Sequence, residues 1–391
     1  MNVPPRRVRL ADNTLDHEEM AAVSSVLASG WLSVGTETRF FEEEFACTVG
    51  VPDAVAVSSG TAALHLAILS LGLAEGDEVI LPSLSFVASA AVVALHGAIP
   101  VFADVRSASD LTIDPHDVEK LITSRTRAII VMHYGGFAAD LVTLSSIAAA
   151  HGVALIEDAA HAPAVSFGTS AIGSLGLIGC FSFHATKNMT TGEGGMVVAR
   201  EPQLLDRIRS MRSHSISSPT FDRVRGGTDG YNVTALGLNY RPTEISSAIG
   251  RVQLRKLSHD RRHRRSLVSI YRQLLREIPG LVVPFDDYKG ESAFHLMPIL
   301  LPPSTNRRAF QAIMREKGID SSVHYPPTHR FEYYEHRFGS TNRRLPITDA
   351  IADRLVSLPL HARMADEDVA FVAESTMRTV GALRAQAEAA L

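Results

Sequence analysis

Between residues 54 and 200 the sequence alternates short apolar runs with longer amphipathic segments, and this alternation limits the fold more than any other feature. Several of the short runs are continuously apolar, as in strands that are buried on both faces. Strands that alternate with helices favour a mostly parallel sheet, here of seven strands, with helices on both faces. We predict strands over residues 54–58, 78–82, 100–104, 128–133, 154–157, 180–183 and 195–199, with intervening helices that include 61–71, 86–96, 115–121 and 141–151.

The pattern changes after about residue 200. A helix, an exposed loop rich in Gly, Ser, Asp and Arg, and a long helix are predicted over 203–212, 213–240 and 243–277. The basic stretch 260–265 in the long helix is interpreted as a solvated face. Later strands are predicted over 294–301 and 319–324, with helices near 307–317 and 366–385. We therefore predict an α/β fold with a large domain over residues 1–250 and a smaller C-terminal α/β domain over residues 251–391.

The composition is that of an ordinary globular protein, with 46% hydrophobic and 20% charged residues. A net charge of −4 gives no reason to expect nucleic acid or an anionic membrane as a partner. The N-terminus has no apolar signal region, and no run of about eighteen apolar residues occurs, so we expect a cytoplasmic protein without a membrane span. The two cysteines, Cys47 and Cys180, supply neither a disulfide framework nor a metal site.

Candidate site residues are those that follow the predicted strands, because open α/β sheets bind ligands at the carboxyl ends of their strands. After the first strand, Ser59, Gly60 and Thr61 lead directly into a helix. The free N–H groups and the positive end of such a helix suit a phosphate group. A serine N-cap with a tight turn gives the same pattern, so both interpretations stay open at this position.

The strand over 154–157 ends in an acidic pair, Glu157 and Asp158. A plain helix start is one explanation of this pair. The other is functional, because a buried carboxylate stays ionised only beside a cation. A protonated pyridine nitrogen is one such cation.

Lys187 follows an apolar strand and precedes the glycine-rich turn over 191–195. The chain has only five lysines among its 38 basic residues, so arginine carries most of the surface charge. An arginine stays protonated, whereas a desolvated amine can lose its proton and form a Schiff base. A lysine that bonds loop carbonyls is the structural alternative. The scarcity of lysine favours the chemical role for Lys187.

These stretches, in this order, resemble the DegT/DnrJ/EryC1/StrS family of sugar aminotransferases among the fold-type-I pyridoxal-phosphate enzymes. The resemblance covers nearly the whole chain, and the ordered set is more specific than any one motif. It is carried by residues 30–32, 41–42, 59–64, 157–161, 182–188, 192–195, 239–241, 253–254 and 324–326.

The resemblance implies pyridoxal 5′-phosphate (PLP) as cofactor, bound as a Schiff base to Lys187 and converted to the pyridoxamine form (PMP) during turnover. Lys187 would move protons, and Asp158 would pair with the pyridinium nitrogen. Phe86 would stack on the pyridine ring and His161 would lie near its 3-oxygen, the alternatives being a core phenylalanine and a structural histidine. The start of a helix and a serine hydroxyl would hold the phosphate, namely Gly60, Thr61, Ala62 and Ser182.

The resemblance also implies a homodimer with shared active sites. Asn239, in a segment with Arg241, would reach the cofactor phosphate of the neighbouring subunit. His324, Tyr325 and His329 would meet the sugar, unless they belong only to a proline-rich surface loop.

The predicted reaction transfers an amino group from L-glutamate to a keto group of a nucleotide-linked deoxy-sugar. An aminotransferase for keto-cyclitols would share the same core motifs. A PMP-dependent sugar dehydratase of this family would have histidine in place of Lys187. A nicotinamide dehydrogenase would need a G-x-G-x-x-G turn after the first strand, which the chain lacks. A non-catalytic regulator with this fold would be expected to lose Lys187 or Asp158.

Overall fold

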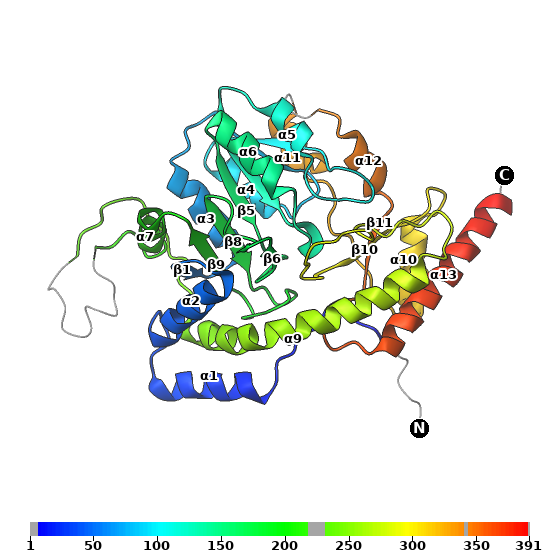
Figure 1. The fold of residues 1–391 in the computed structure, drawn as a ribbon, viewed down its shortest axis with the longest axis horizontal. Coiled ribbons are helices and arrows are strands. Elements are labelled where there is room, and N and C mark those ends of the chain that lie inside the picture. Colours follow the sequence, from blue (N-terminus) through cyan, green and yellow to red (C-terminus); the bar gives the residue numbers. More distant parts are fainter. Residues whose placement is uncertain (1–6, 218–230, 340–342, 390–391) are drawn as a thin grey trace.

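A seven-stranded sheet forms the main body of the protein in a computed structural model that describes residues 7–217, 231–339 and 343–389 (Figure 1). The strand order is β1-β9-β8-β5-β4-β2-β3, and the pairs are parallel except where β9 meets β1 and β8. The predicted, mostly parallel sheet is therefore confirmed. Its strands are β1 (Ala54–Val57), β2 (Glu78–Pro82), β3 (Ile99–Ala103), β4 (Thr126–Met132), β5 (Ala154–Asp158), β8 (Ile178–Ser182) and β9 (Gly195–Ala199).

Helices cover both faces of this sheet, because successive apolar side chains of each strand point to opposite sides. In β4, Ala128 and Ile130 belong to the apolar layer under α3, α4 and α7. Ile129 and Val131 belong to the layer under α5 and α6 on the other face. These helices are α3 (Gly60–Leu71), α4 (Ala88–Leu95), α5 (Pro115–Leu121), α6 (Leu141–His151) and α7 (Pro202–Met211).

Two N-terminal helices, α1 (His17–Ser29) and α2 (Thr36–Val49), pack against the long helix α9 (Glu244–Leu275) (Figure 1). Glu244, in the first turn of α9, accepts hydrogen bonds from the first backbone amides of α2. The donors and N···O distances are Gly35 at 2.9 Å, Glu37 at 2.8 Å and Thr38 at 2.9 Å. A side chain about two hundred positions later in the sequence thus caps α2, whose own N-cap residue is a glycine.

The C-terminal part packs an antiparallel strand pair and several helices around the second half of α9. The predicted smaller α/β part is therefore confirmed, whereas the division at residue 250 remains a proposal and lies inside α9, which both parts share.

Across the described ranges, no helix combines the length and apolar character needed to cross a bilayer. The remaining elements are the strands β6 (Ser166–Phe167), β7 (Ser170–Ala171), β10 (Met297–Leu300) and β11 (Leu355–Leu358), the 3-10 turns η1 (Tyr134–Gly136) and η2 (Thr328–Arg330), and the helices α10 (Arg307–Glu316), α11 (Glu332–Phe338), α12 (Pro346–Ala352) and α13 (Asp366–Ala389).

Two strand predictions in the C-terminal part need correction. The strand predicted over 319–324 is wrong: Ile319 bridges Val8 and Ser322 bridges Ser357, and these separate partners prevent a continuous ladder. The strand predicted over 294–301 begins only at Met297, because Phe294 has a left-handed backbone with φ of 48°. Of the predicted loop over 213–240, residues 218–230 lie outside the described part of the chain.

Candidate active site

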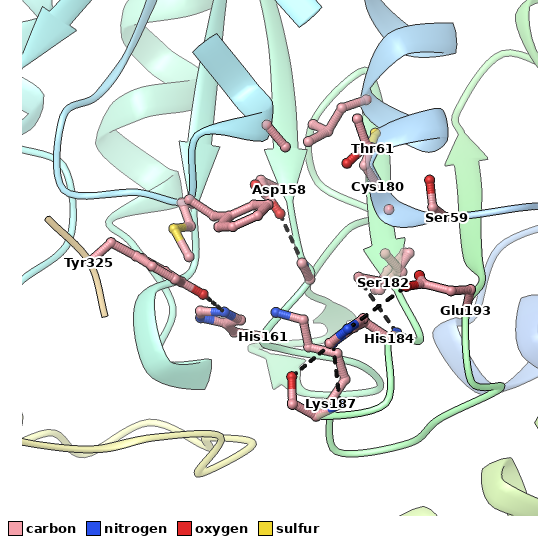
Figure 2. Close-up of a pocket in the computed structure, with 18 of the residues that line it drawn as sticks. Ser59, Thr61, Asp158, His161, Cys180, Ser182, His184, Lys187, Glu193 and Tyr325 are labelled. Atoms are coloured by element: carbon pink, nitrogen blue, oxygen red, sulfur yellow. Dashed lines mark hydrogen bonds and ion pairs between the residues drawn. The ribbon is translucent and has the colours of Figure 1, made fainter. Parts of the chain in front are cut away.

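A cavity of about 430 Å³ lies at the carboxyl ends of β5 and β8 and at the start of α3 (Figure 2). Its position agrees with the rule that open α/β sheets bind ligands at the carboxyl ends of their strands. The cavity brings together nine of the twelve predicted site residues, namely Gly60, Thr61, Phe86, Asp158, His161, Ser182, Lys187, His324 and Tyr325.

Gly60 begins α3 in close contact with Ser182. A Cβ atom on Gly60 would lie 2.7 Å from Ser182 Cβ and 3.1 Å from Ser182 Oγ, so only glycine allows this approach. The Ala62 amide, predicted to hold phosphate, instead donates to Ser59 Oγ at 3.0 Å, and the serine N-cap considered from the sequence is present. Gly60 and Thr61 still line the cavity beside Ser182, and a helix start facing a hydroxyl suits a phosphate group.

Asp158 ends β5 and is only 4% exposed. Its Oδ1 accepts a hydrogen bond from the Ala160 amide at 3.2 Å, and Oδ2 accepts one from Ser89 Oγ at 3.1 Å. Burial raises the pKa of this carboxyl above its ordinary value, and these hydrogen bonds and the charge of Lys187 offset the rise only in part. The residues after Asp158 form turns, which excludes the plain helix start. Because no described cation forms an ion pair with it, this end of the cavity suits a cationic group.

Glu157 points away from the cavity, since neighbouring side chains of a strand face opposite sides. His133 Nε2 lies 3.0 Å from its Oε2, and the ring donates because His133 Nδ1 already accepts from the Ala139 amide. Burial raises the pKa of Glu157, but His133 and backbone donors outweigh this and hold it below the ordinary value. Of the acidic pair, Glu157 is therefore a structural carboxylate, whereas Asp158 faces the cavity. The backbone donors to Glu157 are the amides of Gly173, Leu175 and Gly176.

Lys187 reaches into the cavity toward His161 (Figure 2). Burial lowers the pKa of its ammonium group from 10.5 to about 8, although the Asp158 carboxylate acts in the opposite direction. No hydrogen bond from Nζ to a loop carbonyl occurs within the described residues, so the structural alternative for this lysine is not supported. The adjacent Asn188 fixes the backbone here, because its Nδ2 donates to the Ala293 carbonyl at 2.6 Å. The structure therefore presents a desolvated amine whose Nζ is free to react.

His161 and Tyr325 form a hydrogen-bonded pair with a defined direction. The Gly135 amide donates to His161 Nδ1 at 3.2 Å, and His161 Nε2 lies 2.9 Å from the Tyr325 hydroxyl. Burial lowers the pKa of His161 well below its ordinary value, so the ring is neutral and carries its single proton on Nε2. His161 consequently donates to the Tyr325 oxygen. The phenol, whose pKa is raised by burial, keeps its own proton for another acceptor.

Phe86 lies on the cavity wall between β2 and α4 with 52% of its surface exposed, so it is not a core residue. Its ring centroid is 5.7 Å from that of Tyr325, at an interplanar angle of 55°. An exposed aromatic ring on a cavity wall is available to stack on a planar ligand.

Three predicted site residues lie outside this cavity lining. His329 is held elsewhere, with Nδ1 2.6 Å from Ser83 Oγ and Nε2 3.3 Å from Asp349 Oδ1. Asn239 is exposed on the surface, and its predicted contact with a neighbouring subunit remains a prediction. The third residue, Ala62, is buried in α3.

Sequence reasoning missed several residues that line or support the cavity. Ser89, on α4, reaches Asp158 from an element that carries no motif. His184 and Thr186 lie inside the lysine motif, and their side chains are 3.0 Å apart. Ser59 and Glu193 also line the cavity and stand inside recognised motifs, which was the signal available for finding them. No group of three or more His, Cys, Asp or Glu side chains in the described ranges is arranged to hold a metal ion.

Known proteins resemble this chain over nearly its whole length. Residues 13–377 match the DegT/DnrJ/EryC1/StrS aminotransferase family. The spore coat polysaccharide biosynthesis protein SpsC of Bacillus subtilis is 38% identical over 363 residues, which are 92% of this chain and 93% of SpsC. Helicobacter pylori PseC, an aminotransferase involved in the biosynthesis of pseudoaminic acid, is 30% identical with a TM-score of 0.90, over 96% of this chain and 100% of PseC.

Spr1654 of Streptococcus pneumoniae, solved in a PLP-form and a PMP-form, is 25% identical to this chain. Both forms have a TM-score of 0.89; the alignments cover 97% and 96% of this chain and 100% of theirs. The likeness to the solved structures of PseC and Spr1654 confirms the predicted fold-type-I architecture. The chain belongs to the DegT/DnrJ/EryC1/StrS aminotransferase family.

Proposed function

We propose that the chain uses PLP as its cofactor and that Lys187 binds it covalently. The observation that carries this proposal is the free Lys187 amine, whose pKa is about 8, in one cavity with the Gly60–Ser182 contact and the uncompensated Asp158 carboxylate. The amine suits the aldehyde of PLP, and the Gly60–Ser182 contact suits its phosphate group. The Asp158 carboxylate suits the ring nitrogen. The PLP-form and PMP-form of the relative Spr1654 support PLP as the cofactor.

Each of these residues has a separate task in amino transfer. Gly60 and Thr61 amides and the Ser182 hydroxyl hold the phosphate, and Asp158 keeps the pyridine nitrogen protonated. When bound, the cofactor supplies an electron sink for the electron pair left on a substrate carbon. Nζ of Lys187, released when the amino donor takes its place on the cofactor, would take a proton from the α-carbon of the donor and return one to the former keto carbon of the acceptor. In the cofactor-free chain, burial brings the pKa of this amine to about 8, and an amine with a pKa near neutral suits proton transfer in both directions.

The proposed acceptor is the keto group of a nucleotide-linked deoxy-sugar, and the proposed donor is L-glutamate. The relatives SpsC and PseC, which take part in polysaccharide and pseudoaminic acid biosynthesis, support a sugar acceptor. Tyr325 and His324 line the cavity, and the Tyr325 hydroxyl has a proton available for a sugar oxygen. The burial that lowers the pKa of His324 to about 4 keeps that ring neutral beside the substrate.

We also propose that a homodimer completes the site. Lys187 is the only lysine or arginine in the cavity lining formed by described residues. L-Glutamate carries two carboxylates, and binding them in a partly buried cavity calls for a further cation. In this proposal the segment with the exposed Asn239 and the half-buried Arg241 enters the cavity of a second subunit. Asn239 would reach the cofactor phosphate, and Arg241 would supply the cation.

The test is incubation of PLP-loaded enzyme with ¹⁵N-labelled L-glutamate and a panel of nucleoside-diphosphate keto-deoxy-sugars and keto-inositols. Mass spectrometry should find the label in a nucleotide amino sugar, and Lys187→Ala should abolish the transfer. Label that enters only a keto-inositol would establish the cyclitol alternative. Loss of a sugar hydroxyl without label transfer would establish a dehydratase. Absence of any reaction would overturn the proposed substrate class.

A further inference from the structure

A second cavity, of about 710 Å³, lies between one face of α9 and the segment 288–294. It shares no lining residue with the cavity that contains Lys187. Its lining holds five cationic side chains and one carboxylate, namely Arg261, Arg262, Arg265, Arg272, Lys289 and Glu291. A chain with a net charge of −4 therefore concentrates positive charge around this cavity.

The basic stretch of α9 is not the uniformly solvated face that its sequence suggested. Arg264 is buried, and its Nη1 donates to the Leu360 carbonyl at 3.0 Å. Asp260 is also buried and accepts from Thr14 Oγ1 at 2.8 Å. The cavity-lining residues recur every three or four positions and so share one face of the helix. They are Ser258, Arg261, Arg262, Arg265, Val268, Ser269 and Arg272.

Among the described residues, two of the five cations have partners. Arg261 lies 3.0 Å from Glu291 and also donates to a backbone carbonyl. Arg272 lies 3.5 Å from Asp286. For Arg262, Arg265 and Lys289 the described residues provide no hydrogen bond or ion pair. The helix neighbours Arg262 and Arg265 repel each other, and an anion in the cavity would remove this cost.

We propose that this cavity binds a small anion that carries two or more phosphate groups. A guanidinium group forms paired hydrogen bonds with phosphate oxygens, which makes arginine the preferred residue for such ligands. Three unpaired cations exceed what one phosphate would neutralise. The cavity volume lies within the range of about 300–1,000 Å³ that is usual for small-molecule sites. Two serine hydroxyls can complete the contacts, those of Ser258 and Ser269.

A single short segment, residues 292–294, connects this second cavity to the residue after Lys187. Ser292 and Phe294 line it, and the residue between them, Ala293, accepts the hydrogen bond of Asn188 Nδ2 at 2.6 Å. A bound anion would therefore contact the same segment that fixes Asn188, although it would not touch the proposed cofactor site.

Calorimetric titration of the PLP-loaded enzyme with pyrophosphate and with orthophosphate tests the proposal. The test variant is Arg262→Gln/Arg265→Gln. The control, Arg255→Gln/Arg378→Gln, removes the same charge from exposed arginines that line neither cavity. We expect saturable pyrophosphate binding to the unmodified enzyme and to the control, and binding weaker by about tenfold or more in the test variant. A thermal melt verifies that both variants are folded.

Three results would overturn the proposal. The first is the absence of saturable pyrophosphate binding to the unmodified enzyme. The second is equal affinity in the two double variants, which would place the bound anion elsewhere. The third is orthophosphate binding as tight as that of pyrophosphate, which would contradict a site for more than one phosphate group.

Discussion

A side chain on Gly60 would begin 2.7 Å from the Cβ atom of Ser182. This contact joins the start of α3 to the end of β8, and it brings helix amides and a hydroxyl to one wall of the cavity (Figure 2). The proposed phosphate site therefore depends on the absence of a side chain at position 60.

Replacement Gly60→Ala should weaken PLP binding by about tenfold or more, because the helix start and Ser182 must separate. The measurement is a fluorescence titration of cofactor-free protein with PLP. Gly381→Ala is the matched control, since a Cβ atom there has no neighbour within 4 Å. If both variants bound PLP as tightly as the unmodified chain, the phosphate would not sit at the Gly60–Ser182 contact.

The pH dependence of cofactor loading should report the Lys187 pKa of about 8. Only the neutral amine attacks the PLP aldehyde, so the loading rate should rise by about tenfold from pH 7 to 9 and then level off. An ordinary lysine would give a rise of about a hundredfold that continues above pH 9. Stopped-flow absorbance measures the rate, and the second profile would contradict a desolvated amine.

The same pKa shift predicts how the stability of cofactor-free protein changes with pH. The folded chain binds fewer protons at Lys187 than the unfolded chain between pH 8 and 10.5, so this residue should raise stability as pH increases through that window. Lys187→Met should remove this contribution to the free energy of unfolding, measured by chemical denaturation at several pH values. An unchanged pH slope in the variant would count against the shift.

Replacement Asp158→Asn should lower kcat by at least about a hundredfold, the usual size of losing one preorganised charge contact. PLP should still bind, because the phosphate contacts are on other elements. Ser89→Ala removes only one hydrogen bond to Oδ2 and should cost about tenfold or less. Steady-state kinetics measure kcat of the two variants, and the absorption spectrum of bound PLP shows whether each variant holds the cofactor. An active Asp158→Asn enzyme would contradict a pairing between Asp158 and the ring nitrogen.

Replacement Tyr325→Phe should slow the half-reaction with the keto-sugar by about tenfold and leave the half-reaction with L-glutamate nearly unchanged. The reason is that His161 donates to the Tyr325 oxygen, which reserves the phenol proton for a substrate oxygen. Stopped-flow absorbance separates the two half-reactions. Equal slowing of both would mean that Tyr325 acts on the cofactor or on the fold instead of the sugar.

Replacement Glu244→Ala should lower the free energy of unfolding by about 2–4 kcal/mol, because three amides at the start of α2 lose their acceptor. Chemical denaturation measures the change. Glu244→Gln keeps an acceptor oxygen and should lose less. Two variants of equal stability would show that the cap contact is not what stabilises α2.

The sequence allowed us to predict the features that depend on short stretches of the chain, such as strands and the residues that follow them. Apolar strands followed directly by Asp158 or closely by Lys187 place these side chains at one sheet edge, and the structure shows both there. The direction of a side chain within a loop has no such signal. Tyr325 and His329 belong to one segment, but Ser83 and Asp349 hold His329 away from the cavity.

Contacts between distant segments could not be predicted for a related reason. The Glu244 cap of α2 and the Ser89 contact with Asp158 arise only after the chain has folded, and neither residue belongs to a recognised motif. The short strand β11 pairs with β10 and bridges Ser322 through Ser357, and the four-residue run that forms it has no period that distinguishes it from a helix end. The proposed boundary at residue 250 lies in α9, because a single long helix supports both parts.

The covalent role of Lys187 can be tested directly by borohydride reduction of the PLP-loaded enzyme, followed by proteolysis and mass spectrometry. We predict a reduced pyridoxyl group on the peptide that contains Lys187, and no such group in Lys187→Ala. A pyridoxyl group on one of the other lysines, Lys120, Lys256, Lys289 or Lys317, or on none, would contradict it.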